Sequence, residues 1–258
     1  MQRISKTGDE IEMSKVTAIS GKTHTGKKRS AKVNEDSFYA GMIKDIYLAV
    51  VCDGMGGARG GNIASSLAVE AFVETVTEFL AASSNYRDIL FAAVAKANEK
   101  VFSAAKEDDG LMGMGTTLVA CIFNGKEYYA VNIGDSRMYI IDDKKYGITQ
   151  ITKDHSLVQE LVDSGAMTKE QAEKSPNKNI LTRVLGTDDS VDVDFYKSKY
   201  KSGILLLCSD GLYNYTEESD IAKYVSQYDD IDHCIDELIK KTNENGGGDN
   251  ITAVIIKP

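Results

Sequence analysis

The sequence of 258 residues predicts an α+β fold in which antiparallel sheets are covered by helices. Runs of residues that favour strands alternate with pairs of amphipathic helices and do not follow a regular βαβ rhythm, which is typical of such layered folds. No Pro-rich, Ser-rich or low-complexity linker divides the chain, which holds only two prolines. We therefore expect one domain over residues 16–258, preceded by a flexible polar extension at residues 1–15.

The first half of that domain is expected to alternate short strands with two long helices. A turn at residues 41–44 separates two strand-like runs, and Asn62 is positioned to cap the first helix. Apolar residues then recur close to helical spacing through both helical segments. The expected strands are residues 16–20, 37–40 and 46–52, and the expected helices are residues 63–82 and 86–106.

The second half is predicted to begin with three strands, joined at Asn124-Gly125 and Gly134-Asp135 by the turns of an antiparallel meander. Asp154 is positioned to cap a helix, and Thr168 with Gln171 has the spacing of a capping box before a shorter helix. Because residues 154–183 interrupt the strands, they are predicted to form a mobile flap. The remaining expected elements are strands at residues 191–196, 204–208 and 250–258 and two helices within residues 217–243.

Composition excludes several classes of protein. A net charge of −9 argues against sequence-independent binding of nucleic acid, which needs clustered Lys and Arg. No apolar window of about 18 residues exists, and the first 15 residues lack the apolar core of a secretory signal, so a cytoplasmic protein with no membrane contact is expected. The four cysteines form no Cys-x-x-Cys pair, and Cys52 and Cys208, which lie in apolar strand-like runs, are interpreted as buried small hydrophobic residues.

Four aspartates stand where strands end or begin. The run "YLAVVCDG" ends on Asp53-Gly54 and "ILLLCSDG" ends on Asp210-Gly211, while Asp36 and Asp249 come directly before strand-like runs. In an antiparallel sheet the end of one strand can lie beside the start of the next, so the four carboxylates can share one rim. Gathered carboxylates raise one another's pKa unless a cation neutralises them.

The sequence favours a hard divalent cation at this rim. Only three histidines are present and none lies beside these aspartates in the sequence, so Mg²⁺ or Mn²⁺ fits better than zinc. The glycines after Asp53 allow a sharp turn, so the Gly54 carbonyl could also face the metal. Any one of the aspartates alone could be a turn residue or a helix cap, but four with the same context are hard to explain as coincidence.

Eight fragments in a fixed order carry a family resemblance: "NEDSF", "VCDGMGG", "GMGTTLVA", "NIGDSRMYI", "TKDHSLVQ", "LTRVLG", "LLLCSDGL" and "GGDNITAVI". Together they resemble the metal-dependent Ser/Thr protein phosphatases of type 2C, particularly the single-domain bacterial members. The resemblance implies a four-layer α-β-β-α sandwich with a centre of two Mn²⁺ or Mg²⁺ ions at one end. It also implies a monomer that acts on phosphoproteins, the substrates of a Ser/Thr kinase.

The same resemblance implies a role for each site residue. Asp53 would bridge the two ions, and the Gly54 carbonyl and a water held by Glu35 would serve one of them. The remaining ligands implied are Asp36, Asp210 and Asp249, with Asp135 joining Asp210 at a possible third ion unless it is a plain turn residue. Two ions can share a water and direct it at phosphorus, so hydrolysis needs no phosphoenzyme.

Two positions depart from the family pattern. The arginine that grips the substrate phosphate usually lies three residues before the Asn of "NED", where this chain has Ala31. Arg29, with Lys32 as its rival, is predicted to take that role. A histidine that some relatives use as general acid is replaced by Met55, so water would protonate the leaving oxygen; for His155 a structural hydrogen bond is preferred over that acid role.

Three other functions compete with a phosphatase. "GKTHTGKK" nearly matches a phosphate-binding P-loop, but Lys28 replaces the hydroxyl residue that magnesium needs, and no helix-like segment follows. A non-catalytic member of the fold that binds a partner should have lost metal ligands, yet all four aspartates are present. A metal-dependent phosphodiesterase for nucleic acid would share the ions but lacks a basic surface.

Overall fold

The most apolar strands of the protein are buried on both faces. The computed structural model describes residues 18–258. In β3 (Ile46–Met55), Leu48 and Val50 pack into one core, whereas Val51, pointing to the opposite face, packs into another. The strand β10 (Ile204–Cys208) is divided between two cores in the same way. This alternation places each sheet between two apolar layers and explains why both runs are continuously hydrophobic.

Two antiparallel sheets form the middle of the molecule. One has the strand order β1-β11-β10-β7-β8, and the other has the order β2-β3-β5-β6-β9, with β4 pairing with β3. The further strands of the first sheet are β1 (Ala18–His24), β11 (Ile251–Lys257), β7 (Arg137–Asp142) and β8 (Gly147–Gln150). Those of the second are β2 (Asp36–Ile43), β4 (Gly115–Thr116), β5 (Leu118–Phe123), β6 (Glu127–Ile133) and β9 (Asp194–Lys199).

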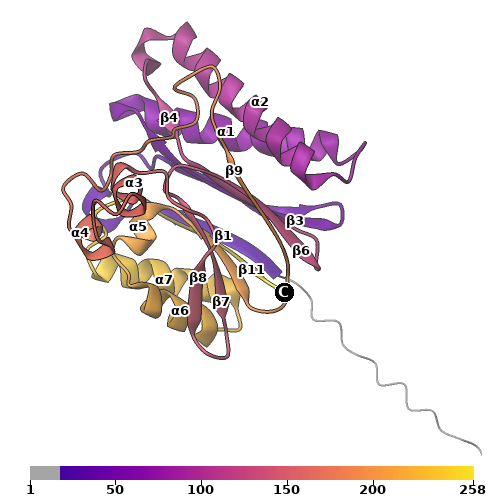
Figure 1. The fold of residues 1–258 in the computed structure, drawn as a ribbon, viewed down its shortest axis with the longest axis vertical. Coiled ribbons are helices and arrows are strands. Elements are labelled where there is room, and N and C mark those ends of the chain that lie inside the picture. The colour runs from indigo at the N-terminus through magenta and orange to yellow at the C-terminus, as the bar shows by residue number, and fades with distance from the viewer. Residues whose placement is uncertain (1–17) are drawn as a thin grey trace, which may run out of the picture.

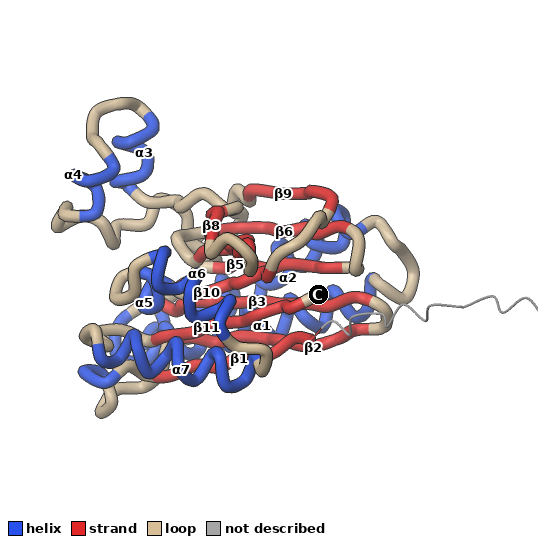
Figure 2. The backbone as a smooth tube through the Cα atoms, turned by 90° about the horizontal axis from the view of Figure 1, so that it is seen from below, coloured by secondary structure: helices blue, strands red, loops and turns tan. Residues whose placement is uncertain are grey.

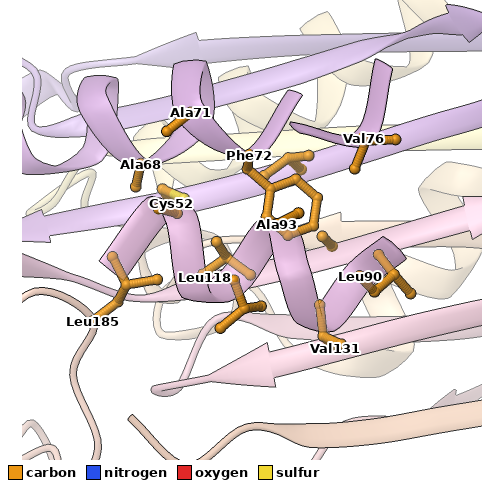
Figure 3. Close-up of a cluster of buried hydrophobic side chains, with 14 of the residues drawn as sticks. Cys52, Ala68, Ala71, Phe72, Val76, Leu90, Ala93, Leu118, Val131 and Leu185 are labelled. Atoms are coloured by element: carbon orange, nitrogen blue, oxygen red, sulfur yellow. The ribbon is translucent and has the colours of Figure 1, made fainter. Parts of the chain in front are cut away.

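Helix pairs cover the two outer faces (Figure 1). The helices α1 (Gly57–Phe79) and α2 (Tyr86–Glu107) lie on the second sheet, and α6 (Glu218–Gln227) and α7 (Ile231–Glu244) lie on the first. Figure 3 shows the core beneath α1 and α2, where Phe72 meets side chains from α2 and the sheet. Burying each such side chain contributes about 1.5 to 3 kcal/mol. The predicted four-layer α-β-β-α sandwich is confirmed.

The segment between β8 and β9 leaves the sandwich. It contains α3 (Leu157–Asp163) and α4 (Lys169–Glu173), which stand away from the four layers at one end of the molecule (Figure 2). Its two ends are joined by a β-bridge between Ser156 and Leu181. The capping box of Thr168 with Gln171 is present as predicted. The flap role of residues 154–183 stays a prediction.

The predicted meander is wrong at its second turn. β6 pairs with β5 and β9, whereas β7 pairs with β10 and β8, so Gly134-Asp135 carries the chain from one sheet to the other. Gly134 has a φ of 93°. Its N–H donates to Nδ1 of His155 over 3.1 Å, and its carbonyl accepts from the N–H of His155 over 2.9 Å. The backbone at Gly134 therefore forms its hydrogen bonds with His155, and not with a neighbouring strand of a hairpin.

Several element boundaries also differ from prediction. α1 begins at Gly57, so Asn62 lies inside the helix and does not cap it. Residues 41–43 belong to β2, and the turn is Lys44-Asp45. Ser156 caps α3 in place of Asp154, because the Asp154 carboxylate is taken by Arg137. The strand expected at residues 191–196 begins later, at Asp194.

Some elements escaped prediction, and one prediction lies outside the described residues. No sequence pattern predicted the strand β8, the short helix α5 (Asp210–Tyr213) or the 3₁₀ helices Lys27–Arg29 and Asp109–Leu111. The extension at residues 1–15 and the expected start of the first strand at Val16 fall outside residues 18–258. Within residues 18–258, no helix is both long and apolar enough to cross a bilayer.

Candidate active site

Strand register brings the predicted aspartates to one edge of the sandwich. The pairing of β2 with β3 sets Asp36 directly opposite Asp53. Asp210 follows β10 and opens α5, while Asp249 lies two residues before β11, the neighbour of β10. The lengths of the apolar runs therefore fix where the chain leaves each sheet, and all four acidic residues lie at that edge.

A cavity of about 920 Å³ opens at this edge. Its walls hold Asp53, Asp135, Asp210 and Asp249, so Asp135, predicted on a turn, joins the other aspartates. Asp36 is not part of the wall and is buried behind it, with 6% of its surface exposed. The other predicted site residues in the wall are Arg29, Lys32, Glu35 and Gly54.

Two buried carboxylate oxygens in this group lack a partner among the described residues. Asp36 accepts from Ser209 Oγ over 2.7 Å and from Thr252 Oγ1 over 2.6 Å, both at Oδ2, and its Oδ1 is left unpaired. Asp210 accepts from Asn214 Nδ2 over 2.9 Å at Oδ2, and its Oδ1 is also unpaired. Leaving a buried charged oxygen without a partner is costly, so both atoms fit a site for a cation.

The pKa shifts of the carboxyl groups agree with this interpretation. Burial raises the pKa of Asp36 to about 6. Burial, together with the negative charges of Asp36, Asp210 and Asp135, raises the pKa of Asp53 well above its ordinary value. Burial likewise raises the pKa of Asp135 and that of Asp210. A bound divalent cation would offset this repulsion and keep the carboxylates ionised.

The carboxylates have the chemistry and the common location that a divalent ion needs, but their side chains are not arranged as a complete coordination sphere. Within residues 18–258, no three acidic, His or Cys side chains already surround a common point. Arg29 takes part of the space, because its guanidinium pairs with Asp249 and also lies 3.2 Å from Glu35 Oε2. Lys32 is exposed in the same wall, so both predicted phosphate-binding cations reach the cavity.

Close backbone packing holds the turn after β3. The Gly54 N–H donates to the Glu35 carbonyl over 3.0 Å. A Cβ on Gly54 would collide with the carbonyl oxygen of Gly61 in α1, so a side chain is excluded there. The glycine-rich sequence after Asp53 thus brings the start of α1 and the Glu35 loop against the cavity.

Threonines that sequence reasoning missed support Asp53. The Asp53 N–H donates to Thr117 Oγ1 over 2.9 Å, and Thr116 Oγ1 donates to the Asp53 carbonyl over 2.9 Å. Thr117 also shares a 2.7 Å hydrogen bond with Ser136. The fragment "GMGTTLVA" contains both threonines, and its paired hydroxyl residues directly before a strand are the signal that could have indicated them.

His155 lies outside the cavity wall and makes structural contacts. Its Nδ1 accepts from Gly134, and its Nε2 lies 3.2 Å from Asp194 Oδ2. Burial lowers its pKa, so the neutral ring is favoured. These contacts agree with the structural hydrogen bond that was preferred for this residue.

Comparison with known proteins identifies the class to which this fold and cavity belong. Residues 21–251 match the family model described as protein phosphatase 2C. The chain therefore belongs to the protein phosphatase 2C family, a class of hydrolases.

Individual relatives agree with this membership. The serine/threonine phosphatase stp of Listeria monocytogenes is 37% identical over 215 residues, covering 81% of this chain and 84% of that protein. The crystal structure of the serine/threonine phosphatase Stp1 from Staphylococcus aureus matches with a TM-score of 0.85 at 30% identity, covering 98% of this chain and 99% of the other. The catalytic domain of the phosphatase PstP, solved in complex with two manganese ions, matches with a TM-score of 0.81 at 32% identity, covering 93% and 97%.

Proposed function

We propose that this phosphatase hydrolyses phosphoserine and phosphothreonine in proteins and uses two Mn²⁺ or Mg²⁺ ions at the carboxylate rim. The observation that carries the proposal is the pair of unpaired buried oxygens, Asp36 Oδ1 and Asp210 Oδ1, beside a cavity that also holds Arg29 and Lys32. Anionic oxygens suit the ions, and the two cationic side chains suit a substrate phosphate. The relatives named as serine/threonine phosphatases support the substrate class.

The ion-binding residues follow from their positions. Asp53 is the best candidate for a ligand shared by both ions, because it lies directly opposite Asp36 in the pairing of β2 with β3 and shares the cavity wall with Asp210 and Asp249. Asp135 shares the wall with Asp210 and is the candidate for a third ion. The remaining groups proposed to hold ions are Glu35 through a water, Asp36, the Gly54 carbonyl, Asp210 and Asp249.

The chemistry proposed is direct attack of an ion-bridging water on phosphorus. The ions, when bound, supply Lewis acidity that lowers the pKa of water and offsets charge on the phosphoryl oxygens. Arg29 or Lys32 orients the phosphate through charge-assisted hydrogen bonds. The bond from phosphorus to the Ser or Thr oxygen breaks, and that oxygen takes its proton from water, since Met55 in the cavity wall has no proton to give.

A phosphoenzyme is not needed in this scheme. Among the described residues, the cavity wall contains no Ser, Cys or His side chain, and its aspartates are the groups proposed to hold the ions. Its one hydroxyl, on Thr117, already accepts from the Asp53 N–H and shares a hydrogen bond with Ser136. Acid quenching after mixing with a ³²P-labelled phosphopeptide should therefore trap no label on the protein, whereas stoichiometric label would overturn direct attack.

Phosphate release from a phosphothreonine peptide, followed as Mn²⁺ is titrated, tests the whole proposal. Wild type should release phosphate only with metal, and Asp210→Asn should lose most of that activity. Asp163→Asn is the matched control, because Asp163 is an exposed carboxylate on α3 and should keep wild-type turnover. No release by wild type with either Mn²⁺ or Mg²⁺ would overturn the proposal and favour a non-catalytic binding protein.

We also propose the partners and setting that the resemblance implies. The substrates would be phosphoproteins made by a Ser/Thr kinase, and the enzyme would act as a cytoplasmic monomer. Light scattering after size exclusion should give a mass near 28.1 kDa, and a dimer mass would overturn the monomer. Activity on a phosphodiester at the level found with the phosphopeptide would instead favour the nucleic-acid alternative.

A further inference from the structure

Exposed aliphatic side chains gather at the mouth of the carboxylate cavity. Val33 is 57% exposed, Ile180 is 48% exposed and Met55 is 41% exposed, and all three line this cavity. They are three of the seven large apolar side chains that stand exposed in residues 18–258. Exposed apolar groups scattered singly need no explanation, but a group of them at a cavity marks a binding surface.

The backbone near each of these side chains is held in place. Met55 pairs with Gly115 of β4. The Ile180 N–H donates to the Asn177 carbonyl over 3.2 Å, and the Ile180 carbonyl accepts from the Leu157 N–H over 2.9 Å. Val33 follows Lys32, whose N–H donates to the Arg29 carbonyl over 2.7 Å. The three side chains therefore come from separate parts of the chain and are presented on hydrogen-bonded segments.

We propose that Val33, Met55 and Ile180 form an aliphatic collar that binds an apolar side chain of the substrate polypeptide next to its phosphoresidue. This inference rests on the proposed function, because the polypeptide that contacts the collar is the phosphoprotein substrate of that reaction. A phosphorylated side chain that enters to meet Arg29 and the carboxylates leaves its own polypeptide lying across the mouth. The neighbouring residues of that polypeptide then contact the collar.

The size and composition of the cavity support this occupant. A volume of about 920 Å³ is near the upper end of the range of roughly 300 to 1,000 Å³ for pockets that hold drug-sized ligands. It is larger than one phosphorylated side chain needs, which leaves room for a neighbour. Beside the collar, the wall carries the cations Arg29 and Lys32 and the small side chain of Ala31, so an apolar surface lies in the same cavity as groups that suit a phosphate. An aliphatic residue close to a phosphate suits that combination.

The test compares phosphothreonine peptides that differ in the position of one leucine. The parent peptide has only Ser and Gly around the phosphothreonine, and Leu replaces one residue in turn at each of the two positions on either side. For wild type with Mn²⁺, at least one placement should raise kcat/KM by roughly five- to tenfold over the parent, the scale expected for filling a partly open apolar subsite. The ratio of kcat/KM for that Leu peptide to kcat/KM for the parent should fall toward one in Val33→Ser and in Ile180→Ser.

Two matched controls separate the collar from general effects. Met42 and Met112 are also exposed apolar residues, at 55% and 74%, but neither lines the cavity. Met42→Ser and Met112→Ser should keep the wild-type ratio between the Leu peptide and the parent. Because the readout is a ratio measured on one enzyme preparation, a variant that folds poorly lowers both values and does not imitate the expected result.

The outcomes distinguish this inference from the function on which it rests. If wild type hydrolyses the parent and every Leu peptide within twofold of one another, the collar is wrong while the phosphatase stands. If the preference exists but Val33→Ser and Ile180→Ser both keep it, the subsite lies elsewhere and the collar is also wrong. If wild type hydrolyses no peptide with either ion, the proposed function fails and takes the collar with it.

Discussion

Replacing Asp154 by alanine is expected to destabilise the fold strongly, because it leaves a mostly buried guanidinium without its carboxylate. Arg137 Nε lies 3.0 and 3.1 Å from the two carboxylate oxygens of Asp154, and Nη2 lies 2.7 Å from Oδ2. Only 9% of the Asp154 side chain and 20% of the Arg137 side chain are exposed. Gln150 adds a 2.8 Å hydrogen bond to Asp154 Oδ1.

The magnitude follows from burial. Removing one partner of a buried ion pair destabilises by about 3 to 5 kcal/mol. The lower end, about 3 kcal/mol, is expected here because Glu218 Oε1 lies 3.4 Å from Arg137 Nη1 and still neutralises part of the guanidinium charge when Asp154 is removed. At about 2 to 4 °C per kcal/mol for chains of this size, Tm should fall by roughly 6 to 12 °C.

A carboxylate in the same segment provides the control. Asp163 pairs with Lys153 over 2.6 Å, but 40% of the Asp163 side chain and 54% of the Lys153 side chain are exposed. Exposed pairs contribute about 0 to 1 kcal/mol, so Asp163→Ala should shift stability by less than about 1 kcal/mol. Both variants remove an aspartate carboxylate from an ion pair, and they differ in how deeply that ion pair is buried.

Urea unfolding in EDTA measures both variants, because bound ions would otherwise add their own stabilisation. The midpoint of Asp154→Ala should fall with little change in the m-value. Equal losses for Asp154→Ala and Asp163→Ala would refute the reasoning, since they would show that burial of the Arg137 pair does not decide its contribution. A midpoint unchanged for Asp154→Ala would refute it as well.

Three further outcomes are expected. Because burial lowers the pKa of His155 in the native state, stability should be lost as pH falls below about 6.5, where the unfolded ring takes up a proton. His155→Asn, which keeps an acceptor for the Gly134 N–H, should lose less between pH 7.5 and 5.5 when urea midpoints are compared. Gly211→Ala should impair folding and phosphatase activity, because its Cβ would collide with the Asn250 carbonyl, whereas Gly147→Ala has room. The Cys52 thiol should react with a disulfide reagent only after unfolding, since burial raises its pKa.

Each of these outcomes has a contrary result. A His155→Asn protein that loses as much stability in acid as wild type would assign the pH response to other groups. Normal activity and stability in Gly211→Ala would show that the chain near Asn250 yields easily. Rapid labelling of native Cys52 would show that the strand carrying it opens to solvent.

The acidic rim could be predicted from the sequence because its position depends on local features. The apolar runs before Asp53 and Asp210 have definite ends, and antiparallel pairing brings the start of β2 to the end of β3 in one sheet and the start of β11 to the end of β10 in the other. The crossover at Gly134 could not be predicted in the same way. A glycine followed by an aspartate indicates that the chain turns, but it does not indicate which sheet receives the next strand.

Tertiary contacts explain the error at the start of α1. Helix propensity disfavours the glycines of residues 56–61, so the sequence placed the start of the helix after them. In the structure the helix begins at Gly57 and includes Gly60 and Gly61, because its first turns lie close to other chain segments. A Cβ on Gly60 would lie 2.8 Å from the Cβ of Met114. Small residues are required there by packing, and packing overrode propensity. The ion pair of Arg137 with Asp154 was missed for a similar reason, since nothing local links the two residues.

That ion pair also connects the candidate ion-binding rim to the segment of α3 and α4. The Arg137 guanidinium lies 3.6 Å from the centre of the Tyr213 ring, and Tyr213 OH donates to the Asp135 carbonyl over 3.0 Å. Asp135 is therefore connected through Tyr213 and then Arg137 to Asp154, where the segment leaves the sandwich. If the segment moves as a flap, a pivot at Asp154 would disturb Asp135. A pivot beyond the bridge between Ser156 and Leu181 would leave these contacts in place.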